Sequence, residues 1–333
     1  CATTNYASTV THTVYGNLIL NNNVATNHCI SVVNSAPSPA NVTLDIKGSV
    51  FLNSGKITMF ESSGSTNPTG TLTIGGNLII GDDGATAAAL QFGSNANNAG
   101  TATVNIKGNL TVASNGSIIK NSGAVGGTMV INFNNSSVAQ SITSNATTPI
   151  VASSNVLIDL KINNPNGVTL NSPITLPQGW RLNLTNGKFN TSSTGLLTVS
   201  TSSGADVIGG SSTSFVNGPL ARVVDVAATP STRVYLVGKG NAYRPVTLSI
   251  TQDAITATSY TVEQFEGQPT SRTLAGSLSK VSEARCFKIT KGTGANVTAA
   301  SVQLSYDAND YVSDATNLRV AKDDGSGNWV DLG

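Results

Sequence analysis

A glycine-led block occurs four times in the first third of the chain. Gly16-Asn17-Leu18-Ile19-Leu20 returns with small changes at residues 48–52, 76–80 and 108–112, so the glycines are 32, 28 and 32 residues apart. A fixed period near 30 residues is typical of folds in which one structural unit stacks on the next. The sequence therefore predicts a stacked repeat architecture for this part of the chain.

The residues that lead into these blocks have the period of a β-strand. Apolar and polar residues alternate in 71–74 and 101–106, and the polar positions are threonine or asparagine. Such alternation indicates strands with one buried face, and the β-branched residues suit a pleated surface. Asn-Gly and Ser-Gly pairs supply turns at residues 54–55, 115–116, 166–167 and 186–187. We therefore expect an all-β chain with little helix.

Short strands that recur every 30 residues fit the coils of a parallel, right-handed β-solenoid, which we predict for residues 1–222. Successive coils would stack at about 4.8 Å. Leucine, isoleucine and valine would then form the core while threonine, serine and asparagine face water. Asparagine side chains at the turns would bond to one another in ladders. A pair of β-sandwiches is the alternative.

The composition changes near Arg222. Residues 1–200 contain 12 charged side chains, whereas residues 201–333 contain 23. Six or seven alternating segments follow, which predicts an antiparallel β-sandwich for residues 223–333. The end at 328–333 looks cut in mid-strand, so we expect that more protein follows.

The charge of the chain argues against nucleic acid as a partner, and its apolar runs argue against a membrane span. Charged residues make up 11% of the chain and its net charge is +1, whereas ordinary soluble domains have about 25% charged residues. Without a basic run, nucleic acid is not expected as a partner. No apolar run approaches the roughly 18 residues of a membrane span.

Three cysteines leave at least one thiol unpaired. A disulfide between Cys1 and Cys29 is one interpretation, and a lipid on Cys1 is another. Cys286 lies between apolar neighbours, which indicates a buried free thiol. His12 and His28 are the two histidines, and we interpret both as exposed polar strand residues because neither has a partner at metal-ligand spacing.

Acidic residues are the candidates for a functional site. The densest group is Asp307, Asp310 and Asp314, a candidate calcium site, although calcium requires six to eight oxygen ligands and hairpin loops are the alternative. The same two interpretations apply to 82–83 and 323–324. Residues 1–200 hold five acids without an evident acid–base pair. Trp180 is expected to pack in the core or at a rim, and stacking on a sugar is the alternative. We therefore predict a chain that is not an enzyme and needs no cofactor apart from a calcium ion.

Several segments of the second half resemble a known class of protein. They are residues 160–174, 215–220, 235–238, 243–245, 302–307, 318–321 and 329–333. Together they resemble the large secreted or cell-surface, adhesin-like repeat proteins of the Bacteroidota. The resemblance implies an extracellular or cell-surface location and export by the type 9 route, although no C-terminal sorting domain is present in this sequence.

These observations favour a non-enzymatic extracellular scaffold, adhesin or fibre component. The open strand edges of a solenoid template further pairing, so we expect self-association into filaments or contact with other surface proteins. A carbohydrate-binding or carbohydrate-active β-helix protein, with glycans as partners, is the alternative. A segment of a larger enzyme is the third interpretation.

Overall fold

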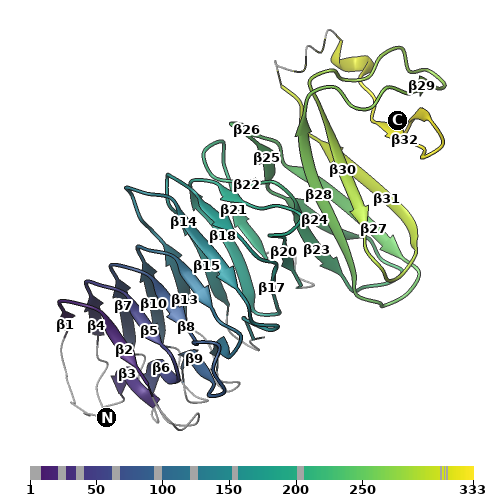
Figure 1. Cartoon of the computed structure of the whole chain (residues 1–333). Helices are drawn as coiled ribbons and strands as arrows, with labels where there is room; N and C mark the ends of the chain where they lie inside the picture. Colours follow the sequence, from purple (N-terminus) through teal and green to yellow (C-terminus); the bar gives the residue numbers. More distant parts are fainter. Residues whose placement is uncertain are drawn as a thin grey trace.

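A computed structural model describes residues 9–21, 28–34, 41–61, 68–93, 100–120, 127–151, 157–200, 206–307, 310, 312 and 314–333. The chain is an elongated stack of coils that leads into a second group of sheets at the C-terminal end (Figure 1). Apart from a short 3-10 turn, η2 (Ala315–Asn317), all named elements are β-strands. The prediction of an all-β chain is confirmed.

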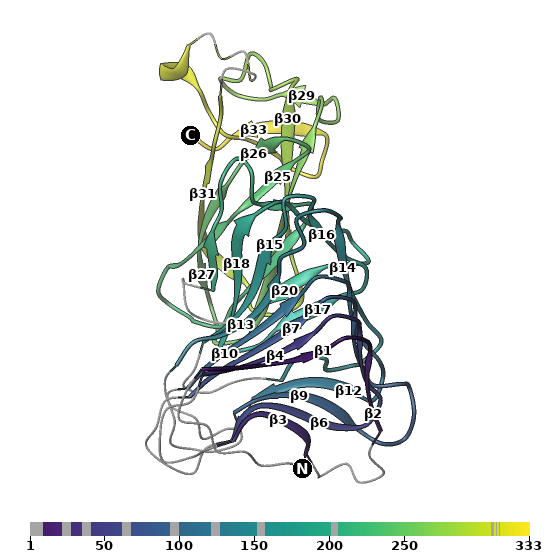
Figure 2. The same ribbon diagram turned by 90° about the vertical axis from the view of Figure 1, so that its left-hand side faces the viewer.

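Most coils contribute one strand to each of three sides (Figure 2). The first side is an eight-stranded sheet made of β1 (Val10–Val14), β4 (Asn41–Ile46), β7 (Thr69–Ile74), β10 (Thr101–Ile106), β13 (Met129–Phe133), β15 (Ile158–Asn163), β18 (Trp180–Asn186) and β21 (Val207–Gly209). The second side begins with β2 (Leu18–Leu20), β5 (Val50–Leu52), β8 (Leu78–Ile80), β11 (Leu110–Val112) and β14 (Gln140–Ser144), and continues through β16 (Val168–Leu170), β19 (Phe189–Asn190), β22 (Val216–Asn217), β25 (Val237–Lys239) and β26 (Ala242–Tyr243).

The third side is interrupted. Its first part contains β3 (His28–Asn34), β6 (Gly55–Glu61), β9 (Ala88–Phe92) and β12 (Gly116–Lys120). Beyond β12, a single bridge joins Ile118 to Ile150. A second sheet then begins on the next coil with β17 (Ile174–Leu176), β20 (Leu197–Val199) and β23 (Leu220–Val224).

The repeated blocks of the sequence pair in register on successive coils of the stack. Leu18, Val50, Leu78 and Leu110 occupy the same position on successive parallel strands of the second side. The strands that lead into them pair in the same way on the first side, residue for residue. The parallel β-solenoid is therefore confirmed, and the glycine-led blocks lie in one sheet.

Alternation along each strand builds the core. Val50, Leu52, Leu78 and Ile80 point inward with 0% exposure, while the residues between them are half-buried. Burial of such side chains contributes about 1.5–3 kcal/mol each. One hydrophobic cluster extends from the first coils as far as Val262, so the interior continues into the C-terminal sheets.

The glycine-led turns carry a ladder of polar side chains. The side-chain oxygen of the residue after each glycine accepts a hydrogen bond from the backbone N–H of the equivalent residue one coil further on. The donor–acceptor distances are 2.8 Å from Ser49 to Asn17, 3.0 Å from Asn77 to Ser49, 2.8 Å from Asn109 to Asn77 and 2.8 Å from Ser141 to Asn109. Side-chain pairs of the expected kind also occur, such as Asn53 with Asn21.

The glycines make room for this ladder. A Cβ atom added at Gly48 or Gly108 would lie less than 3.0 Å from the ladder side chain and the backbone of the preceding coil. The same glycines bond to each other through the backbone, with 2.8 Å between the nitrogen of Gly108 and the oxygen of Gly76. Glycine is therefore needed at these positions because the coils approach each other closely. The backbone dihedral angles of these glycines do not by themselves require glycine.

Antiparallel pairing begins within the sheets of the solenoid. β23 pairs in parallel with β20 on one edge and antiparallel with β28 (Thr258–Glu266) on the other, and β28 pairs with β30 (Arg285–Lys291). Likewise β25 is parallel to β22 and antiparallel to β26. Parallel stacking thus extends past Arg222, where the sequence predicted the junction.

Two smaller sheets complete the C-terminal part. The first contains β24 (Ser231–Tyr235), β27 (Val246–Gln252) and β31 (Val297–Leu304), which are antiparallel. The second contains β29 (Thr273–Leu274), β33 (Asn328–Asp331) and β32 (Ala321–Asp323), in which β29 is parallel to β33. Antiparallel pairing predominates in residues 223–333, as expected, and their arrangement as a sandwich stays a prediction.

A buried ion pair lies where the two parts meet. Arg222 is 1% exposed, and its Nη2 lies 3.1 Å from Oδ2 of Asp206, which is 3% exposed. Nη1 of Arg222 donates to the carbonyl of Val234 at 2.8 Å, and the Tyr235 hydroxyl donates to the carbonyl of Tyr260 at 3.0 Å. These bonds connect strands of different sheets and fix the joint.

Candidate functional site

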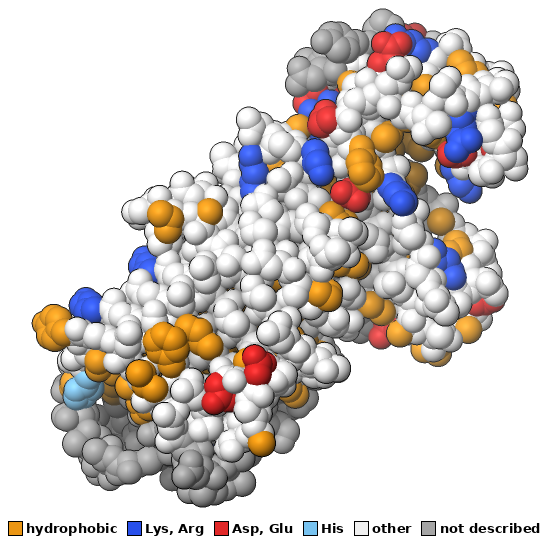
Figure 3. Space-filling model, viewed as in Figure 1, with side chains coloured by type: hydrophobic (Ala, Val, Ile, Leu, Met, Phe, Trp, Pro, Cys, Tyr) orange, Lys and Arg blue, Asp and Glu red, His pale blue; other side chains and the backbone are white. Residues whose placement is uncertain are grey.

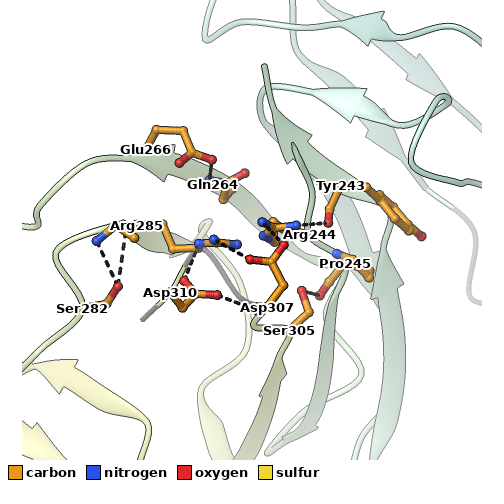
Figure 4. Close-up of polar contacts among 11 residues, drawn as sticks. Tyr243, Arg244, Pro245, Gln264, Glu266, Ser282, Arg285, Ser305, Asp307 and Asp310 are labelled. Carbon is orange, nitrogen blue, oxygen red and sulfur yellow. Dashed lines mark hydrogen bonds and ion pairs between the residues drawn. The ribbon is translucent and has the colours of Figure 1, made fainter. Parts of the chain in front are cut away.

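Two of the three acids that the sequence singled out, Asp307 and Asp310, lie beside arginines (Figure 4). Asp307 places Oδ2 2.5 Å from Nη2 of Arg244 and Oδ1 3.4 Å from Nη2 of Arg285. Asp310 places Oδ1 2.7 Å from Nε of the same Arg285, whose side chain is 4% exposed. The two carboxylates neutralise guanidinium groups contributed by distant parts of the sequence.

Asp314 lies in a different environment. Its side chain accepts hydrogen bonds from the backbone N–H of Thr316 at 2.9 Å and from Nδ2 of Asn317 at 2.6 Å. Asp314 is thereby the N-cap residue of η2. A hydrogen bond from the Thr316 hydroxyl at 2.6 Å, together with those from Asn317 and the Thr316 backbone, lowers the pKa of the Asp314 carboxyl. In the described part of the chain, no three histidine, cysteine or acidic side chains form a group that could hold a metal ion. Of the three candidate calcium ligands, Asp307 and Asp310 therefore form ion pairs with two arginines, and Asp314 caps a turn.

We expect calcium to leave the stability of the protein unchanged. Thermal unfolding in about 10 mM calcium and in chelator should give the same midpoint, because that concentration exceeds the dissociation constants, about 0.1–1 mM, of weak extracellular sites. Asp310→Asn should lower the free energy of unfolding by about 1–3 kcal/mol in both buffers, because it leaves Arg285 without its closest carboxylate. A calcium-dependent rise in midpoint that Asp310→Asn abolishes would contradict this expectation and support a calcium site at these acids.

The other acidic loops bond internally. Asp324 accepts hydrogen bonds from the side chain and backbone of Asn328 and from the backbone of Ser326, which lowers its pKa to about 2. It lies in the hairpin between β32 and β33. Oδ1 of Asp83 accepts from the backbone N–H of Ser114 at 2.7 Å, across one coil. Both loops match the turn interpretation.

The remaining sequence candidates have structural surroundings or lie beyond the described part. Cys1 and the side chain of Cys29 are outside the described residues, so their disulfide stays a prediction. Cys286 is a half-buried free thiol, and burial raises its pKa. Trp180 is fully buried, and its Nε1 donates to the carbonyl of Val151 at 3.1 Å. Its indole is therefore part of the core and is not available as a sugar-stacking surface.

A hollow lies where the third side is interrupted, a place that sequence reasoning did not identify. Its volume is about 390 Å³, and Thr147–Ile150 on one coil and Pro173–Thr175 on the next line it, together with Pro177, Leu196 and Thr198. Proline has no N–H to donate to a neighbouring strand, and three of the residues that line the hollow are prolines. Prolines on adjacent coils are the sequence signal that could have located the interruption.

A second hollow of about 210 Å³ shares Leu196 with the first. It is lined by Ser193, Pro219, Thr261, Glu263, Lys288 and Thr290. Serine and threonine hydroxyls are the commonest polar groups in the lining of the two hollows, which contains the single carboxylate of Glu263 and no aromatic ring. The paired carboxylates that glycoside hydrolysis uses are not found among these lining residues.

Comparison with known proteins gives no relative. No family model, no curated protein and no solved structure matches the chain. Among the described residues, none forms an apolar helix of the length that a bilayer requires.

Proposed function

We propose that this protein is a non-enzymatic extracellular scaffold, an adhesin or fibre component in which the solenoid acts as a rigid spacer. The observation that carries the proposal is the continuous parallel pairing of the eight strands of the first side, from β1 to β21. Eight strands at about 4.8 Å separate the first and last by about 34 Å. A stack of this kind resists bending because every coil is bonded to both neighbours.

The joint supports the same function. A flexible linker would let the C-terminal sheets move independently, whereas here β23 belongs to both parts and Arg222 is buried between them. The spacer therefore presents its C-terminal sheets at a fixed distance and orientation. The extracellular location and the adhesive role are supported by the resemblance to secreted surface proteins and by the low charge of the chain.

Two measurements test the proposal. Antibody labelling of cells that make the protein should mark intact cells, with an antibody to a cytosolic protein as the control that marks only permeabilised ones. Negative-stain electron microscopy of the purified chain should show straight particles with a constant angle between the solenoid and the C-terminal part. Labelling that requires permeabilisation contradicts the location, and a variable angle contradicts the rigid spacer.

A further inference from the structure

The two ends of the solenoid differ. At the C-terminal end, β28 and β26 add antiparallel strands to two of the solenoid sheets. At the N-terminal end, β1, β2 and β3 form the first rung, and among the described strands each pairs only with the next coil. Among the residues that the structure describes, therefore, no strand pairs with the outer edge of the first rung.

The first rung carries apolar side chains at the same positions as an interior coil, but these side chains are more exposed. Leu18 and Leu20 are half-buried, whereas Val50 and Leu52, their counterparts on the next coil, are 0% exposed. Tyr15 and Ile19 are exposed by 88% and 60%, and hydrophobic side chains gather at this end of the surface (Figure 3). Further contact at this end would bury apolar area that is now in water.

The turn of the first rung is also open. No described atom lies within 4 Å of a Cβ built on Gly16, although the preceding coil fills that place at Gly48 and Gly108. The backbone N–H groups of Ser49, Asn77 and Asn109 each donate a ladder bond to a side-chain oxygen of the coil before. The ladder shows no such partner for Asn17 among the described residues.

Charge does not protect this edge. Natural edge strands use charged residues, especially lysine, or proline to prevent pairing with another chain. In this sequence the first charged side chain is that of Asp45, on the second rung, so that β1, β2 and β3 contain no charged residue.

We propose that a second copy of this chain covers the first rung, head to head, with β1 paired antiparallel to β1 of the other copy. The strand reads Val-Thr-His-Thr-Val, so pairing about His12 places valine opposite valine and threonine opposite threonine. A self-complementary contact of this kind closes with two-fold symmetry. Because the other end continues into antiparallel sheets, the assembly stops at a dimer and does not grow into a filament.

Substitutions of His12 test the proposal, because one is expected to strengthen the dimer and another to weaken it. Its position on β1 corresponds to Leu44 on β4 and Leu72 on β7. His12→Leu should tighten the dimer, because leucine fills this position on the next two coils. His12→Lys should weaken it at least about fivefold, because two like charges would lie opposite each other. Val234→Lys is the matched control, since it adds the same charge at an exposed position of edge strand β24.

Sedimentation velocity over a wide range of concentration measures these effects, and circular dichroism checks that each variant is folded. Mixed Thr11→Cys and Thr13→Cys chains should cross-link to each other on oxidation, with peptide mapping to identify the joined thiols. A chain that stays monomeric at every concentration overturns the proposal. Growth beyond dimers, or cross-links that join Thr11→Cys to itself, also overturns it. A monomer would leave the proposed rigid spacer unaffected, so the two proposals fail separately.

Discussion

Gly108→Ala is expected to lower the free energy of unfolding by about 1–3 kcal/mol, the usual cost of forcing an extra methyl group into a packed site. The added Cβ would lie less than 3.0 Å from the side chain of Asn77 and from the backbone of Gly76. Backbone atoms cannot move aside without separating two coils, so the clash is relieved only by loss of stacking. Urea denaturation followed by circular dichroism gives the change directly.

Gly16→Ala is the matched control for this prediction. Gly16 has the same place in the repeat, but no described atom lies within 4 Å of its added Cβ. The stability of this variant should stay within about 0.5 kcal/mol of the parent, as for ordinary surface substitutions. Equal losses at Gly16 and Gly108 would show that glycine is needed for local conformation and not for coil-to-coil contact.

Asp206→Asn is expected to cost about 3–5 kcal/mol, because removing one partner of a buried ion pair leaves the other charge without compensation. Burial lowers the pKa of the Arg222 guanidinium, and the charge of Asp206 opposes that shift. The substitution keeps the shape of the side chain and removes its charge. Thermal and urea unfolding should both register the loss, with circular dichroism at low temperature confirming the fold.

An exposed pair provides the comparison. Asp45 and Lys47 are 2.6 Å apart, closer than Asp206 and Arg222, but their side chains are 21% and 54% exposed. Asp45→Asn should therefore cost no more than about 1 kcal/mol. The double variant Asp206→Leu with Arg222→Met should recover much of the stability lost in Asp206→Asn, because it leaves no buried charge. Similar losses for Asp45→Asn and Asp206→Asn would contradict the role given to burial.

The repeat could be predicted because it is local and periodic. Glycines 28 to 32 residues apart and alternating strands between them specify both the coil length and the face that points inward. What the glycines do could not be predicted in the same way. Gly48 accommodates Asn17 of the preceding coil, and this requirement exists only once the two coils are stacked.

The junction between the parallel and antiparallel parts was harder to predict from composition. Composition indicates which side chains face water, but it does not indicate whether strands pair in parallel or antiparallel. The number of charges rises near Arg222, yet β23, which contains that residue, still pairs in parallel with β20. The partners of the acids were equally hidden. Asp307 is 63 residues from Arg244 in the sequence, and only the fold brings them to 2.5 Å.

The direction of the hydrogen bonds in the stack has a mechanical consequence. Bonds between coils run along the long axis, whereas the covalent chain winds around it. A pull applied along the axis therefore loads the bonds of one coil interface after another, and each interface that opens releases roughly 30 residues, about 100 Å of extended chain. Under tension the rod would lengthen in steps, absorbing energy at each one.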